Sequence, residues 1–161
     1  MRPPFVFLPV LAVLLSGCYE TRAPVVTNGV RAEAVKDGRW RRADGSELVL
    51  SWNQADSAYR VDAGGEVRLA PLGGLWLADY QAERNVVLLA RLSKDQVVLL
   101  EPTPEVEAKL IAAHGLGVRP GPVNRLSGDP AELRRFLGDL AKLEGAGVLR
   151  EAERLTWVGP S

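Results

Sequence analysis

The chain has 161 residues, of which 47% are hydrophobic, and its 20 basic residues are balanced by 20 acidic residues. Nucleic-acid binding needs a dense basic patch, so this balance excludes that class of partner. One cysteine, Cys18, and one histidine, His114, are too few for an internal disulfide or a structural zinc site, so we expect no metal and no other cofactor.

Residues 1–17 have the composition of a secretion signal. Met1 and Arg2 give a short positive end, and an apolar run follows over residues 5–15. A membrane-spanning helix needs about 20 apolar residues, whereas a shorter apolar run followed by small residues is typical of a secretory signal. Later apolar runs are short and interrupted by charge, so we expect no membrane span elsewhere in the chain.

The sequence LSGC at residues 15–18 resembles the lipobox of bacterial lipoproteins, in which one large aliphatic and two small residues precede an invariant cysteine. The resemblance covers the first 18 residues. It implies that the thiol of Cys18 receives a diacylglycerol and that residues 1–17 are removed. Tyr19 stands where an aspartate favours the inner membrane, which implies the periplasmic leaflet of the outer membrane in a double-membrane bacterium.

Residues 18–36 are polar and lack a sustained periodicity, so they predict a lipidated tether ahead of a single domain over residues 37–161. Alternating apolar and polar residues from about residue 39 to 101 predict short strands. The turns between them are too short for parallel crossovers, which favours an antiparallel meander. The hairpin over residues 86–100 is apolar on both faces, and we expect another layer to cover its second face.

Two C-terminal helices are predicted to form that layer. Thr103 and Pro104 begin the first, which ends at Gly115, and Asp129 caps the second. Residues 154–158 predict a last strand. The fold class is therefore α+β: a bent antiparallel meander or small barrel of about seven or eight strands, with two helices packed on it. This plan resembles that of the lipocalin-like calycins.

Five residues are candidates for binding. Tryptophan combines apolar area with one hydrogen-bond donor, so Trp40 and Trp76 could line a cavity or an interface, although core packing is the alternative. Arg41, Arg60 and Arg68 lie on or near strands and could form a basic outer face that meets anionic lipid or polysaccharide. Their alternative is an ordinary solvated position.

The sequence contains no nucleophile elbow. We therefore expect a non-catalytic, lipid-anchored protein that binds an envelope protein or polymer, with the membrane as its partner through Cys18. The alternative is a lipocalin-like carrier of a small apolar ligand. A third hypothesis, a cell-wall hydrolase, requires two converging carboxylates, for which Asp62, Asp79 and Glu101 are the candidates.

Overall fold

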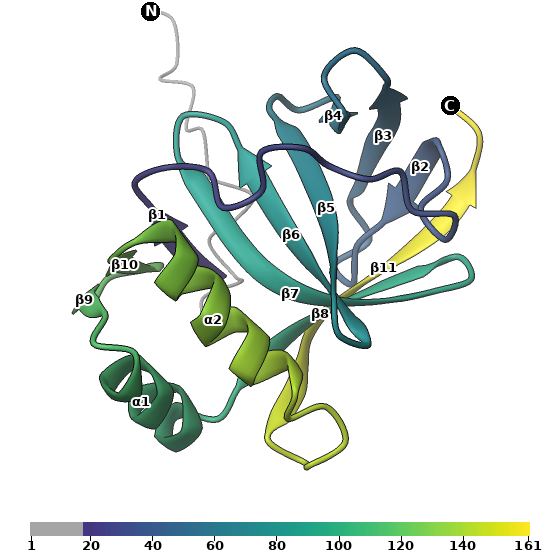
Figure 1. Ribbon diagram of the computed structural model, residues 1–161. Helices are drawn as coiled ribbons and strands as arrows, with labels where there is room; N and C mark the ends of the chain where they lie inside the picture. The colour runs from purple at the N-terminus through teal and green to yellow at the C-terminus, as the bar shows by residue number, and fades with distance from the viewer. Residues whose placement is uncertain (1–17) are drawn as a thin grey trace, which may run out of the picture.

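Eight antiparallel strands close into a barrel in the computed structural model, which describes residues 18–161 (Figure 1). Around the barrel the strands follow chain order, and the last pairs with both β8 and β2. The barrel strands are β2 (Gly38–Arg41), β3 (Glu47–Asn53), β4 (Ala58–Val61), β5 (Glu66–Leu72), β6 (Leu75–Gln81), β7 (Asn85–Ser93), β8 (Gln96–Pro102) and β11 (Leu149–Gly159). The predicted small antiparallel barrel is confirmed.

Three short strands extend the sheet beside β7: β1 (Cys18–Thr21), β9 (Gly117–Arg119) and β10 (Asn124–Ser127). The first half of β7 pairs with β1, and its second half pairs with β8 on the same edge. β10 then runs parallel to β1, and β9 pairs with β10. Sequence reasoning predicted none of these strands, because each is short and gains its partner from a distant part of the chain.

The hairpin of β7 and β8 is covered on both faces, as predicted. Val86, Leu88 and Ala90 face the barrel interior, whereas Val87 and Leu89 face the helices. The two faces therefore belong to two separate apolar cores, one inside the barrel and one between the barrel wall and the helices.

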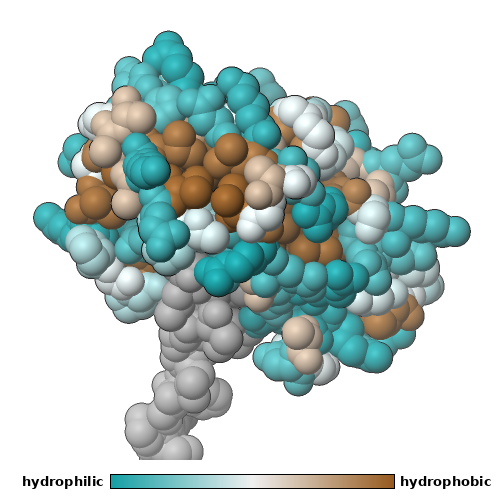
Figure 2. Space-filling model, turned by 90° about the horizontal axis from the view of Figure 1, so that it is seen from below, coloured by the Kyte–Doolittle hydropathy of each residue, from teal (hydrophilic) through white to brown (hydrophobic). Residues whose placement is uncertain are grey.

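Helices α1 (Pro104–Ala113) and α2 (Pro130–Ala141) form the outer layer. The side chain of Asp129 accepts a hydrogen bond from the Ala131 N–H at 2.7 Å, which explains where α2 begins. Phe136 and Leu137 of α2 are fully buried against the barrel. In the described part of the chain, neither helix is long and apolar enough to cross a membrane. Seen from below, the molecule shows apolar groups among hydrophilic ones (Figure 2).

The predicted tether is packed against the barrel. β1 is a buried strand, and residues 22–37, which we name the strap, cross in front of β5 and β6 (Figure 1). The Asp79 carboxylate accepts hydrogen bonds from the N–H groups of Val25 and Val26 at 2.6 and 2.8 Å. Further along, Ala32 and Val35 reach the barrel interior. Residues 18–36, which the sequence predicts as a tether, are therefore held against the barrel by long-range contacts.

Candidate functional site

Cys18 opens β1 and lies on the interior face of the barrel, opposite Leu88. Only 5% of the residue is exposed. Burial, followed by the charges of Glu101 and Glu153, raises the pKa of its thiol to about 12. Because the thiolate is the nucleophile, the folded chain holds this sulfur in its unreactive, protonated form at neutral pH.

A buried ion pair joins β11 to the end of β2. The guanidinium of Arg42 donates to both carboxylate oxygens of Glu153, at 2.9 and 3.1 Å, and only 8% of either side chain is exposed. A β-bulge interrupts the pairing of β11 with β8 between Glu151 and Glu153, at the point where the Glu153 side chain is buried. Because the contact has two hydrogen bonds and both side chains are buried, the stability that the pair contributes depends strongly on the presence of both partners.

Trp40 is completely buried in the barrel interior, so the structure places this candidate binding residue in the core. Its indole N–H donates to the carbonyl of Lys36 at 3.0 Å, which satisfies its one polar group. Tyr59 fills the same interior and binds the strap: its hydroxyl accepts from the Ala32 N–H at 3.0 Å and contacts the Val35 carbonyl at 3.1 Å.

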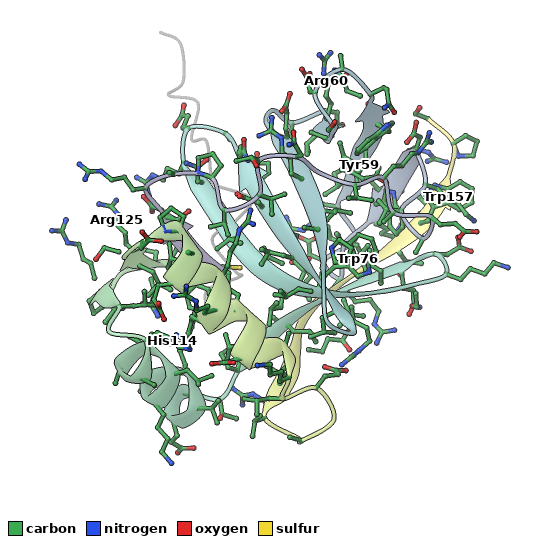
Figure 3. All side chains as sticks on the ribbon, in the orientation of Figure 1. Tyr59, Arg60, Trp76, His114, Arg125 and Trp157 are labelled. Atoms are coloured by element: carbon green, nitrogen blue, oxygen red, sulfur yellow. The ribbon has the colours of Figure 1, made fainter. Side chains whose placement is uncertain are left out.

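Trp76 lines a pocket of about 550 Å³ between the strap and the barrel wall. The pocket combines an apolar wall with a charged rim. The wall includes Trp76 and Leu92, and the rim consists of Glu33, Lys36, Lys94 and Asp95. The Lys36 ammonium bridges the Asp95 carboxylate at 2.5 Å and lies 4.5 Å from the Trp157 ring centroid. Figure 3 labels Trp76 and Trp157 on the barrel. Such a site suits an apolar ligand with one polar end.

The three candidate arginines do not form one basic face. Arg41 pairs with Glu47 at 3.1 Å and Arg60 pairs with Asp56 at 3.2 Å, both on the surface. Arg68 lies 3.5 Å from Glu66 and also donates to Gln81. These residues come from β2, β4 and β5, and each has its own acidic neighbour. Local neutralisation removes the concentrated charge that the predicted basic surface requires.

A basic groove of about 640 Å³ lies elsewhere, between β1, β9, β10 and the turn joining β6 to β7. We use the name basic groove for the site that contains the charged residues Glu20, Arg22, Glu83, Arg84, Arg119 and Arg125. Sequence reasoning missed it because its four arginines come from three distant stretches of the chain: Arg22, Arg84, and residues 115–128. Their only sequence signal was the irregular stretch from 115 to 128, which contributes Arg119 and Arg125.

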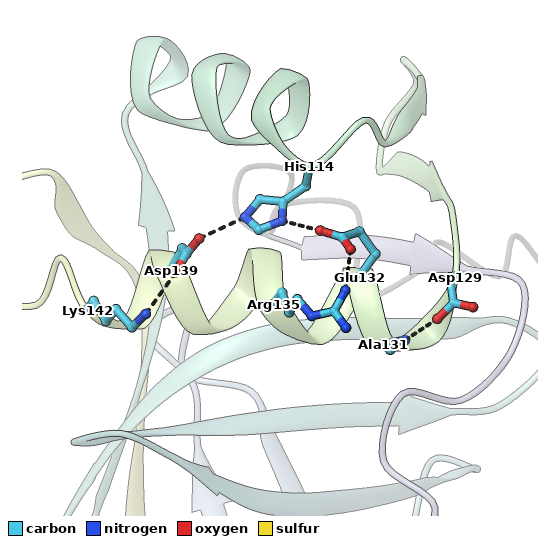
Figure 4. Close-up of polar contacts among 7 residues, drawn as sticks. All are labelled: His114, Asp129, Ala131, Glu132, Arg135, Asp139 and Lys142. Carbon is cyan, nitrogen blue, oxygen red and sulfur yellow. Dashed lines mark hydrogen bonds and ion pairs between the residues drawn. The ribbon is translucent and has the colours of Figure 1, made fainter.

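His114 lies between two carboxylates of α2 (Figure 4). Its Nδ1 is 2.5 Å from Glu132 and its Nε2 is 2.8 Å from Asp139. Hydrogen bonding to Glu132, and then to Asp139, raises the pKa of His114 against the opposing effect of burial. Both ring nitrogens lie against carboxylate oxygens, so neither faces a space that a substrate could enter. Its evident role is to join the end of α1 to α2.

The carboxylates considered for hydrolysis are engaged separately. Asp79 binds the strap, Glu101 lies 3.7 Å from Arg150, and Asp62 accepts the Val49 N–H at 2.9 Å. Within residues 18–161, no group of three or more His, Cys, Asp and Glu residues is arranged to hold a metal ion. Comparison with protein-family models, with curated proteins and with solved structures finds no match to this chain.

Proposed function

We propose that this chain is a bacterial envelope lipoprotein, anchored by lipid on Cys18 in the periplasmic leaflet of the outer membrane, and that its barrel binds a partner without catalysis. The observation that carries the proposal is the sequence that leads to Cys18. A short apolar run over residues 5–15, preceded by Met1 and Arg2, is followed directly by the LSGC motif at residues 15–18.

The burial of Cys18 sets the order of events in this proposal. A protonated, interior thiol does not react, so the diacylglycerol is attached before β1 pairs with β7. Acyl chains do not fit beside Leu88 in a packed interior, so the lipidated residue turns outward. Residues 19–21 retain their register with residues 85–87, which holds the barrel close to its anchor.

The non-catalytic part of the proposal is supported by the state of the polar groups. His114 is occupied at both nitrogens, and the candidate carboxylates serve structural contacts on different elements. Two concave sites offer binding surfaces instead. They are the pocket between the strap and the barrel wall that Trp76 lines, which we name the strap pocket, and the basic groove. Each combines concave shape with charge, which suits recognition of an envelope component.

The anchor is tested by expressing the full chain in a double-membrane bacterium and measuring the mass of the product. We expect a chain that begins at Cys18 and carries acyl groups, recovered with the outer membrane. Cys18→Ser should keep the leader and yield no acylated product. Ser51→Thr, an exposed position on β3 outside the motif, serves as the control and should be processed and acylated like the wild type. An unmodified thiol in the wild-type product would contradict the proposal.

A second candidate function, carriage of a small apolar ligand, is favoured by the strap pocket. Its volume of about 550 Å³ lies within the range of about 300–1,000 Å³ that is usual for small-molecule sites. The test is titration of the chain with a medium-chain fatty acid while tryptophan fluorescence is recorded. We expect a saturable change that Trp76→Phe reduces. The change should be preserved in Trp52→Phe, because Trp52 lies on β3 and does not line the pocket. Unchanged wild-type fluorescence would remove the carrier function and leave the anchor unaffected.

A further inference from the structure

We propose that the basic groove docks on anionic lipid headgroups of the same membrane in which Cys18 is anchored. This inference rests on the proposed anchor. It adds a second membrane contact, which fixes the orientation of the barrel on the bilayer.

The groove has an excess of positive charge that its own acids do not neutralise. Four arginines face two glutamates there. Glu20 is shared, because it lies 2.9 Å from Arg125 and 3.6 Å from Arg84. Arg22 and Arg119 have no ion-pair partner within residues 18–161. Arginine binds phosphate oxygens through its planar fork of donors, so this set of side chains suits phosphate-bearing headgroups.

The groove is within reach of the membrane that the anchor would define. Arg22 follows Cys18 by four residues, so their Cα atoms are at most about 14 Å apart. Glu20, which pairs with Arg125 in the groove, is only two residues from Cys18 in the sequence. The groove therefore begins close to the anchored end of the chain.

Two further features favour a membrane surface over a small soluble anion. Among the described residues, only Val30 and Val118 are large apolar side chains with high exposure, and Val118 lines the groove beside Arg119. Binding at a membrane surface combines burial of apolar side chains with attraction of basic side chains to anionic lipids, and Val118 with the arginines offers both. The arginines also reach outward: 71% of the Arg84 side chain and 48% of the Arg125 side chain are exposed. Figure 3 places Arg125 on the opposite side of the molecule from Trp157.

The experiment uses the lipidated chain in vesicles of phosphatidylcholine with and without phosphatidylglycerol. Ser127→Cys in the groove carries a fluorophore, and Ser51→Cys on β3 carries the same fluorophore as the matched position. A quencher on the lipid headgroups reports proximity. We expect stronger quenching at position 127 when phosphatidylglycerol is present, little change at position 51, and loss of the difference at about 1 M salt, where the Debye length is about 3 Å.

Charge variants test which arginines are responsible. Each arginine near an anionic surface strengthens binding about fivefold. The double variant Arg22→Gln, Arg119→Gln should therefore lower the ratio of docked to free groove about 25-fold. Arg41→Gln with Arg60→Gln changes net charge equally at a distance and should leave the ratio unchanged. Equal quenching in both kinds of vesicle, or an equal effect of both double variants, would overturn the docking proposal.

Two additional arms separate the explanations. Inorganic phosphate that displaces the groove from the vesicles at low millimolar concentration would identify a soluble-phosphate site and overturn docking on lipid. If mass measurement shows no lipid on Cys18, the anchor proposal fails by itself. Co-sedimentation of that unlipidated chain with phosphatidylglycerol vesicles, compared with the Arg22→Gln, Arg119→Gln variant, then tests the groove, and an unchanged affinity of the variant would overturn it.

Discussion

Replacement of Asp79 by alanine is expected to release the strap from the barrel. Asp79 is completely buried, and one carboxylate oxygen accepts the N–H groups of both Val25 and Val26. Alanine would leave these two buried donors without their acceptor. The barrel strands themselves would keep their hydrogen bonds, so the first effect should be local to the strap.

The magnitude follows from these two donors. Each buried donor left without a partner costs about 1–3 kcal/mol, which gives about 2–6 kcal/mol for the pair. Removing a buried carboxylate offsets part of this loss, because burial raises the pKa of Asp79 against the opposing hydrogen bonds of Val26 and Val25. We therefore expect Asp79→Ala to lower the free energy of unfolding by about 3 kcal/mol, or about 6–12 °C in Tm.

The pH dependence of this loss has a definite sign. A carboxyl whose folded pKa is raised contributes its full stability below its unfolded pKa, and the contribution is lost as pH rises through the folded pKa. The alanine variant lacks this titration. The difference between wild type and Asp79→Ala should therefore be larger near pH 4 than near pH 7.

Urea unfolding at both pH values measures the difference, and hydrogen exchange at Val25 and Val26 localises it. Asp79→Asn is the matched control, since its amide oxygen can still accept both N–H groups, and it should lose less than half as much stability as alanine. Equal losses for the two variants, or a loss below about 1 kcal/mol for alanine, would refute the reasoning.

Three other substitutions test separate parts of the structure. Phe136→Ala should lower the free energy of unfolding by about 3–5 kcal/mol in urea unfolding because it leaves a cavity beneath α2, and a loss under about 1 kcal/mol would contradict the buried packing. His114→Ala should destabilise most between about pH 5 and 6.5 and little at pH 9, because a raised folded pKa gives stability that disappears as pH rises through it; a pH-independent loss would argue against the charged bridge. Glu153→Ala should cost about 3–5 kcal/mol by removing the carboxylate from buried Arg42, whereas Arg42→Met with Glu153→Leu should recover most of that loss; no recovery in the double variant would contradict the pair's interdependence.

The antiparallel barrel could be predicted because its determinants are local. Alternating apolar residues specify which face of a strand is buried, and short turns permit only antiparallel neighbours. The two-sided apolar pattern of residues 86–100 likewise predicted the covering layer of helices. Asp129 and Pro130 marked the start of α2 because capping uses groups within one turn of the chain.

Glu132 illustrates where local reasoning ended. It follows Asp129 by three residues, which is the spacing of a capping box, yet its side chain contacts His114 and Arg135. Trp40 and Trp76 have the same chemistry, but one is fully buried and the other lines a pocket. A residue type and its neighbours in sequence do not specify which distant partner it will meet.

The sequence by itself determined the strand alternation, the helix starts and the LSGC motif at residues 15–18, because each depends on residues that are close along the chain. Only the tertiary structure decided that residues 22–37 form a strap, since Asp79 binds it from 54 and 53 residues away. The basic groove required three distant stretches of the chain, residues 20–22, 83–85 and 117–127, to converge. Long-range hydrogen bonds and charge clusters depend on how the closed sheet brings these segments together, and no local pattern records that arrangement.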